Sequence, residues 1–390
     1  MDPSDFADVL ASVREFVRDE VVPREGEIEA ADEVPEKLRE ACKAMGLYGF
    51  AIPEQFGGIG LTMAEEVELA MELGWTTPSL RSLFGTNNGI AGQVLLAGGT
   101  PDQQQEWLPR LATGEVVASF ALTEPDAGSD PSSLTTKASR IEEGSDGDVW
   151  VITGAKRWIT NAPLADVLMV FARTDTQAAP AKGISAFLVP TTAPGVSFSE
   201  HDAKMGQRGS WTCEVYLDDV RVPAANLVGG EQGLHRGFVT AMKCLAHGRL
   251  HIAALCMGTA ARLVEEMRAF AVEREQGGHR IAAYQLVQGL VADAVTDWHA
   301  GRALVREAAK AYDDGSDTTL GPSTAKYFCS EAVGRIADRA VQVHGGAGYM
   351  RGVPVERMYR DVRLFRIYEG TSQIQQVIIA RGVLGAAARG

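Results

Sequence analysis

The spacing of the hydrophobic residues changes twice along the chain, and this change constrains the fold more than any other feature of the sequence. Between Phe6 and Gly114 apolar residues recur every three or four positions, the spacing that buries one face of a helix. From Val116 to Pro223 short runs rich in β-branched and aromatic residues replace this spacing, with turn residues between them. From Leu234 onward the helical spacing returns in longer elements. We therefore expect helices, then strands, then helices again.

The three zones predict three folding units in the 390 residues. We expect an N-terminal α-helical domain over 1–115, a central β domain over 116–233 and a C-terminal helical domain over 234–390. No helical run lies between the β-rich segments, so the central domain is predicted to be an antiparallel barrel or sandwich. The long apolar stripes of the last zone predict a four-helix bundle. The expected strands cover 116–122, 149–153, 167–174, 184–189 and 214–220.

Charge and cysteine usage exclude several classes of partner. A net charge of −14 argues against nucleic acid or an anionic membrane, because either needs a basic face. The five cysteines are scattered and include no C-x-x-C pair, which indicates free thiols in a reducing compartment and no metal site. The acidic N-terminus, with Asp2, Asp5 and Asp8, is unlike a signal or transit peptide, and no apolar run reaches transmembrane length. We expect a cytoplasmic protein.

Two segments of the β zone carry groups suited to a planar ligand. The run 121–130 leads from a strand into a Pro/Asp/Gly/Ser turn, whose exposed backbone N–H groups can hold carbonyls, ring nitrogens or phosphates. In the run 156–161, Trp158 can stack on a heterocycle while the Thr160 hydroxyl bonds its edge. Taken alone, the first run is more typical of a plain surface turn, and the second of a core tryptophan.

The third chemical segment lies near the C-terminus. Glycines at 345, 346 and 348 end an apolar-striped helix and let backbone approach a ligand. Glu369 follows Tyr368 and precedes a helix that Thr371 or Ser372 can cap. Partial desolvation by its neighbours raises the pKa of such a carboxyl toward the range of a general base. Taken alone, the acid also suits a helix start, where the dipole favours it.

Together these segments, in this order and spacing, resemble the acyl-CoA dehydrogenase family over nearly the whole chain. The run 121–130 looks like the first family signature and 342–361 like the second, while Tyr-Glu-Gly-Thr at 368–371 resembles the medium- and short-chain members, whose base lies there. The resemblance implies FAD bound between the β domain and the bundle, in a homotetramer (a dimer of dimers) where a neighbouring subunit completes the flavin site. It also implies an acyl-CoA substrate and an electron-transfer flavoprotein as acceptor.

The resemblance implies a role for each matching residue. Glu369 is expected to take the α-proton while a hydride leaves the β-carbon for flavin N5, giving a trans-2-enoyl thioester. Residues expected to contact FAD are Leu122, Thr123, Ser129, Trp158, Ile159, Thr160, Arg274, Gln285, Gln342, Gly345, Gly346, Thr371 and Gln373. Of these, four are expected to reach the FAD of a neighbouring subunit: Arg274, Gln285, Gln342 and Gly346. Residues expected to contact the substrate are Ser129, Arg249, Tyr368, Gly370 and Arg81.

The sequence departs from the family pattern at a few positions. Ala246 stands where the family has an acid three residues before Arg249, which weakens the expectation for the CoA contacts. Gly277 replaces the aromatic residue that follows the arginine at 274, where it would pack against the neighbouring flavin. Isovaleryl-type members carry their base immediately before the bundle arginine, and that position here is Gly248, which cannot act as a base. The departure at Gly248 strengthens the assignment of Glu369.

Arg81 and Ser82 raise the question of whether the substrate has a second carboxylate. The pair resembles the one that holds a distal carboxylate in glutaryl-type enzymes, although Gly74 stands where those enzymes have an acid. An unpaired cation in apolar surroundings is costly, so a side chain that extends to solvent is the competing interpretation. The alternatives are therefore a dicarboxylic acyl-CoA dehydrogenase, an acyl-CoA oxidase on the same fold, and a non-catalytic acyl-thioester-binding protein.

Overall fold

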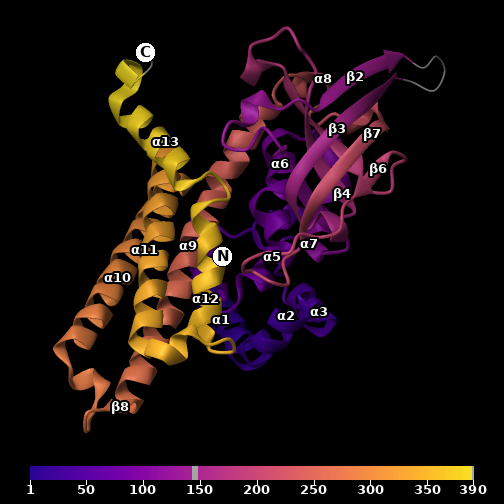
Figure 1. The fold of residues 1–390 in the computed structure, drawn as a ribbon. Helices are drawn as coiled ribbons and strands as arrows, with labels where there is room; N and C mark the ends of the chain where they lie inside the picture. Colours follow the sequence, from indigo (N-terminus) through magenta and orange to yellow (C-terminus); the bar gives the residue numbers. More distant parts are fainter. Residues whose placement is uncertain (143–147, 389–390) are drawn as a thin grey trace.

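The computed structural model describes residues 1–142 and 148–388, and helices from both ends of the chain pack beside one curled sheet (Figure 1). Side chains cap several of the N-terminal helices: Asp2 accepts from the backbone N–H of Ser4, and Thr62 and Thr100 each form a capping box. The N-terminal helices are α1 (Pro3–Glu15), α2 (Glu25–Ala31), α3 (Glu36–Ala44), α4 (Met63–Leu73), α5 (Pro78–Gly89), α6 (Ala91–Gly98) and α7 (Pro101–Thr113).

The central region is a seven-stranded sheet in the order β1-β4-β2-β3-β7-β6, with β5 paired to β4. The pairs β2–β3, β3–β7, β4–β5 and β6–β7 are antiparallel, which confirms the predicted kind of sheet. The pairs that β4 makes with β1 and β2 are parallel, so the sheet is antiparallel in most but not all of its pairs. The strands are β1 (Ala118–Ala121), β2 (Lys137–Glu142), β3 (Asp148–Thr160), β4 (Val167–Arg173), β5 (Ile184–Pro190), β6 (Val196–Phe198) and β7 (Thr212–Pro223).

Two strands of the central sheet have no counterpart in the prediction, and a third is much longer than predicted. Strand β2 is exposed at most positions and β6 has three residues, so neither shows a buried alternating pattern. Strand β3 continues to Thr160 and contains two register shifts, between Ile152 and Gly154 and between Lys156 and Ile159. Such bulges interrupt the period of two from which a strand is recognised in sequence.

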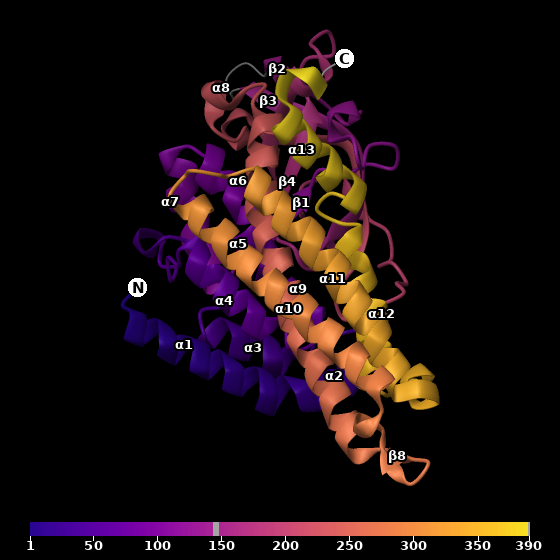
Figure 2. The same cartoon turned by 90° about the vertical axis from the view of Figure 1, so that its left-hand side faces the viewer.

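The C-terminal region is the predicted helical bundle, in which α9, α10 and α11 run alongside one another (Figure 2). Helix α9 is buried along much of its length, and α4 of the N-terminal region packs against it. No helix among the described residues is long and apolar enough to cross a membrane. The elements are α8 (Gly230–Gly233), α9 (Gly237–Glu273), β8 (Glu275–Gln276), β9 (His279–Arg280), α10 (Gln285–Asp313), α11 (Leu320–His344), α12 (Pro354–Val362) and α13 (Ser372–Leu384).

The largest hydrophobic core joins the two helical regions. Val17 and Leu38 from the N-terminal helices belong to the same buried cluster as Leu255 and Ile336 from the bundle. Two smaller clusters contain the inward side chains of the sheet. Residue 115 lies between α7 and β1, and residue 233 lies at the end of α8, shortly before α9. The division into domains at these points stays a prediction.

Candidate active site

Glu369 lies in a sharp turn at the start of α13. Its backbone has a φ of 54°, and Gly370 follows with a φ of 91°. Thr371 then caps α13, because its side chain accepts from the backbone N–H of Ile374 at 3.3 Å. A side chain on residue 370 would also meet the amide of Gln375, so glycine is required at that position. The turn directs the Glu369 carboxyl inward instead of along the helix.

Three side chains hold the backbone of this turn. Gln375 Nε2 donates to the carbonyl oxygens of Glu369 and Gly370, at 3.1 and 3.0 Å. Lys326 on α11 donates to the Gly370 oxygen at 2.7 Å. Arg249 on α9 donates from Nε to the Glu369 oxygen at 3.4 Å. Since these donors come from three helices, the position of the turn depends on how the helices pack.

One oxygen of the Glu369 carboxyl, Oε2, is buried without a hydrogen-bond partner among the described residues. Gly248 lies directly against this oxygen, and a Cβ at that position would collide with it. Burial raises the pKa of the carboxyl above its ordinary value, and nearby cations oppose the shift, those of Arg81, Lys326 and Arg249. An unpaired carboxylate with a raised pKa has the properties of a general base.

The residues around Glu369 predicted to bind substrate are drawn together by the fold. Arg249 is buried, and its Nη1 atom lies 3.4 Å from the hydroxyl of Ser323. Burial raises the pKa of Tyr368 well above its ordinary value, so the phenol stays neutral. Arg81 on α5 is only 8% exposed and is the strongest cationic influence on both Tyr368 and Glu369. Burial therefore excludes the interpretation of Arg81 as a side chain that extends to solvent.

The end of β3 presents an aromatic side chain at the surface. Trp158 has a φ of 55° and is 56% exposed, with the Arg157 guanidinium carbon 4.9 Å from its ring centre. Thr160 lies two residues further along, and its carbonyl oxygen accepts from Ser119 at 2.8 Å. Asn161 ties this strand end to α5, because its amide donates to the Ser82 oxygen at 2.7 Å. The tryptophan predicted to flank a planar ring is thus exposed, and a core-filling role is excluded.

A buried ion pair supports the loop that contains Leu122 and Thr123. Lys156 and Glu124 pair at 2.7 Å, and the same ammonium donates to the Leu122 oxygen at 3.3 Å. Burial favours a higher value, but Lys156 outweighs it and lowers the pKa of Glu124 to about 2. The Thr123 oxygen accepts from the backbone N–H of Arg157, which links the loop to the Trp158 segment. Ser129, further along the loop, is exposed.

The remaining predicted FAD residues divide into two groups. Thr371 and Gln373 belong to the start of α13, beside Glu369. The others lie at the far end of the bundle near the β8–β9 hairpin, which is at the bottom of Figure 1, or at the end of α11: Arg274, Gln285, Gln342, Gly345 and Gly346. All five of these residues are exposed, and exposed apolar side chains accompany them, with Leu286 at 88% exposure.

Several residues at this site were not predicted from the sequence. Lys326 and Gln375 hold the turn, and the buried residues His251 and Glu66 lie in sequence beyond Arg81. Lys326 lies on the apolar stripe of α11, where a lysine amid apolar residues was a signal that something pairs with it. Glu66 shows no comparable signal, because acids are common on amphipathic helices.

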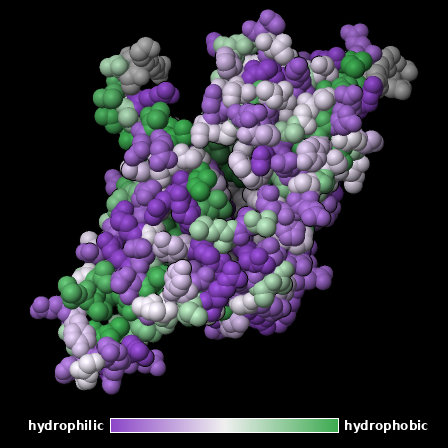
Figure 3. All heavy atoms as spheres, in the orientation of Figure 1, coloured by the Kyte–Doolittle hydropathy of each residue, from purple (hydrophilic) through white to green (hydrophobic). Residues whose placement is uncertain are grey.

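The surface is hollowed between the C-terminal helices and the sheet, with hydrophobic residues visible inside the hollow (Figure 3). The exposed ring of Trp158, with the hydroxyl groups and backbone of the neighbouring strand end, suits a planar ring system. The turn before α13 adds a carboxyl oxygen without a partner among the described residues. These features fit a flavin and define the class of protein: an oxidoreductase that combines a planar redox cofactor with a buried carboxylate.

Comparison with known proteins identifies the family. Residues 4–115, 119–220 and 235–384 match the N-terminal, middle and C-terminal domains of acyl-CoA dehydrogenases. The chain is 38% identical to the probable acyl-CoA dehydrogenase YngJ of Bacillus subtilis, over 96% of this chain and 97% of the relative. It is also 38% identical to the caffeyl-CoA reductase–Etf complex subunit CarC of Acetobacterium woodii, over 91% of each chain.

A solved structure gives the same result. The structure of butyryl-CoA dehydrogenase from Megasphaera elsdenii superposes with a TM-score of 0.92 at 29% identity, covering 97% of this chain and 98% of that one. The chain belongs to the acyl-CoA dehydrogenase family, and it is an FAD-dependent enzyme that acts on acyl-CoA thioesters.

Proposed function

We propose that Glu369 is the base that removes the α-proton of the acyl-CoA, in the same event in which a hydride leaves the β-carbon. The observation that carries this proposal is the buried Oε2 atom without a hydrogen-bond partner, set against the glycine at 248. Bound FAD supplies the hydride acceptor, at flavin N5. The two C–H bonds break, a carbon–carbon double bond forms, and the product is a trans-2-enoyl thioester.

The residues of the chain provide three contributions to this step. Glu369 must be ionised to accept the proton, and the surrounding cations limit how far burial raises its pKa. The donors to the carbonyl oxygens of residues 369 and 370 hold the carboxyl in one orientation. The backbone N–H of Glu369 donates to no described residue, so it is available to the thioester oxygen as negative charge develops there.

We propose two alternative classes of natural substrate. A fatty acyl-CoA is the first, as the family resemblance implies, with a role in fatty acid metabolism. A dicarboxylic acyl-CoA is the second, and one observation favours it: Arg81 is a buried cation that forms no ion pair with a carboxylate among the described residues. Most of the guanidinium N–H groups therefore remain available to a distal carboxylate of a substrate.

We further propose an electron-transfer flavoprotein as acceptor, supported by the relative that is named as a subunit of a reductase–Etf complex. The exposed residues at the far end of the bundle support a homotetramer in which subunits share flavin sites. The free cysteines support a cytoplasmic location.

Isotopic substitution tests the assignment of the reaction. The oxidised enzyme is mixed without oxygen with acyl-CoAs deuterated at the α-carbon, at the β-carbon or at both, and bleaching of the flavin is followed. We expect each single substitution to slow the bleaching, and an enoyl-CoA to form in equal amount to the reduced flavin. Reduction that is insensitive to α-deuteration would contradict removal of an α-proton in this step. Rapid reoxidation of the reduced flavin by oxygen would instead favour an oxidase.

A further inference from the structure

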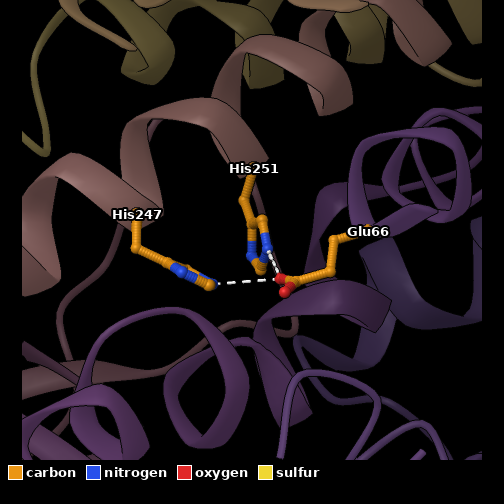
Figure 4. Close-up of side chains that lie close together, drawn as sticks. All are labelled: Glu66, His247 and His251. Atoms are coloured by element: carbon orange, nitrogen blue, oxygen red, sulfur yellow. Dashed lines mark hydrogen bonds and ion pairs between the residues drawn. The ribbon is translucent and has the colours of Figure 1, made fainter. Parts of the chain in front are cut away.

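A chain of buried polar groups runs behind the proposed base, from α5 through α9 to α4. Arg81 Nη2 lies 3.0 Å from His251 Nδ1, and His251 Nε2 contacts Glu66 Oε2. His247, one turn earlier on α9, places its Nε2 atom 3.0 Å from the same oxygen. Figure 4 shows both imidazoles directed at the one carboxylate. All four side chains are buried, which removes competition from water.

The arginine fixes the proton positions in this chain. A guanidinium can only donate, so the Nδ1 atom of His251 must accept. The Nε2 atom of a neutral His251 then carries the proton and donates a hydrogen bond to the Glu66 carboxylate. Burial lowers the pKa of His251 to about 4, so the ring is neutral at pH 7. Burial acts to raise the pKa of Glu66, but the two imidazoles outweigh it and lower that pKa to about 2.

The helix that carries Arg81 provides space for its side chain. Residues 85 and 89 are glycines that follow Arg81 at intervals of four, so all three lie on one face of α5. A Cβ at Gly85 would lie 2.6 Å from Arg81 Nη1, and one at Gly89 would lie 3.0 Å from Nη2. The guanidinium therefore occupies a groove that only glycines leave open, and it lies in that groove against His251.

Arg81 and Glu369 attract one another without forming an ion pair. Arg81 is the largest cationic influence on the Glu369 carboxyl, yet neither side chain has an ion-pair partner in the other. A direct pair would occupy the carboxylate that the proposed reaction needs as its base. We propose that Glu66 is the fixed counter-ion of Arg81, linked to it through His251, and that this relay holds the guanidinium away from the carboxylate of Glu369. Glu66 and His251 are thus positioning residues, an inference that rests on the proposed function.

A bound divalent metal is the competing explanation for two histidines and a glutamate in one place. A metal would take the lone pair of His251 Nε2, and the proton would then move to Nδ1. That proton would face the N–H groups of Arg81, donor against donor, 3.0 Å away. The arginine therefore favours a hydrogen-bonded relay over a metal centre.

The test measures how the rate of flavin reduction falls at low pH in the FAD-loaded enzyme. Groups that influence Glu369 are Arg81 from α5, His247 and Arg249 from α9, Lys326 from α11 and the adjacent Tyr368. Glu66→Gln removes a negative charge and releases Arg81 toward Glu369, which lowers the pKa of the base. We therefore expect the acid limb of the pH–rate profile (the pH range over which the rate falls) to move down by about one pH unit or more. Arg81→Met removes the cation, and we expect the limb to move up. In the Arg81→Met background, Glu66→Gln should move the limb by only a few tenths of a unit.

Matched variants separate the relay from a structural role. Glu68→Gln, on the same helix, removes an acid that pairs with Arg306 at the surface and should leave the limb in place. His251→Gln can still accept and donate, so we expect it to retain the wild-type limb, whereas His251→Phe should shift it as Glu66→Gln does. If Glu66→Gln loses FAD or unfolds, the two His251 variants decide the question.

Two results would overturn the relay. One is an unshifted acid limb in a folded, FAD-loaded Glu66→Gln or His251→Phe enzyme. The other is stoichiometric zinc, nickel or cobalt in the purified wild-type protein that is lost in Glu66→Gln. Neither result bears on the base itself, which is judged separately by the Glu369→Gln variant.

Discussion

Single residues at this site occupy conformations that proteins usually avoid. A non-glycine residue at positive φ costs on the order of 1–3 kcal/mol, and Glu369 has a φ of 54°. The hydrogen bonds to its carbonyl oxygen offset part of this cost. The result is a carboxyl whose Oε2 atom is fixed in a buried position, where a helical backbone would have directed it elsewhere. Strain at this residue is therefore linked to orientation of the proposed base.

We expect Glu369→Gln to bind FAD and enoyl-CoA while flavin reduction slows by about 10³-fold or more, because the amide keeps the shape of the acid but cannot take a proton. Stopped-flow absorbance measures the rate. In the wild type the base works only when ionised, and burial raises its pKa. The wild-type rate should therefore fall as the pH drops through a value above the ordinary range of a glutamate. Unchanged reduction in the variant would remove Glu369 from the mechanism.

Arg81 decides between the two proposed substrate classes. If it binds a distal carboxylate, dicarboxylic acyl-CoAs should be better substrates than monocarboxylic ones of equal length. Truncating one partner of such a buried pair costs about 2–5 kcal/mol, so Arg81→Met should reverse the preference in kcat/KM. A panel of both classes, assayed with wild type and variant, gives the ratio. A ratio that the substitution does not change would leave the fatty acyl-CoA as the substrate.

At the scale of elements, a buried lysine is one of the side chains that join α11 to the start of α13. Lys326 has no exposed surface, and its ammonium donates to the carbonyl oxygen just before α13. Burial lowers its pKa to about 8, which shows the cost of placing a charge there. The lysine thus contributes to the position of the Glu369 turn at the expense of stability. Lys156 in the sheet is likewise a buried lysine that donates to a backbone carbonyl oxygen, that of Leu122, while it pairs with Glu124.

We expect Lys326→Met to lower the rate of flavin reduction roughly 10- to 100-fold, because a small displacement of the base is enough for such a loss. The melting temperature should change little, since removal of a buried charge offsets the lost hydrogen bond. Lys310→Met, an exposed lysine on the neighbouring helix α10, is the matched control and should match wild type in both measurements. A variant with full activity would show that Gln375 and Arg249 suffice to hold the turn.

At the scale of the whole molecule, the site depends on how three regions meet. The proposed site takes Trp158 from the sheet, Arg81 from α5 and the turn of Glu369 from the bundle. The main hydrophobic core joins the first and last regions, so α4 and α5 are fixed relative to α9. The family resemblance, and not a contact in this chain, assigns a neighbouring subunit's flavin to four exposed residues of the bundle: Arg274, Gln285, Gln342 and Gly346.

Arg274→Ala tests this shared site. Loss of a bidentate contact to a pyrophosphate should lower FAD content after dilution and gel filtration, while acyl-CoA affinity of the flavin-loaded fraction stays the same. Arg268→Ala is the control, because that arginine lies on the same helix, is exposed and pairs with Glu265. Wild-type FAD content in the Arg274 variant, or an equal loss in the control, would contradict the proposed contact.

The sequence by itself determined the order of helical and β regions, the sheet type and the turn that carries Glu369. These features depend on local hydrophobic spacing and on short motifs, both visible in one dimension. Tertiary structure alone decided which side chains surround the base. Lys326, Gln375 and Arg249 converge on one turn from different helices, and Glu66 lies behind Arg81 only because α4 packs on α9. Burial and charge pairing depend on such long-range packing, and no local pattern in the sequence records it.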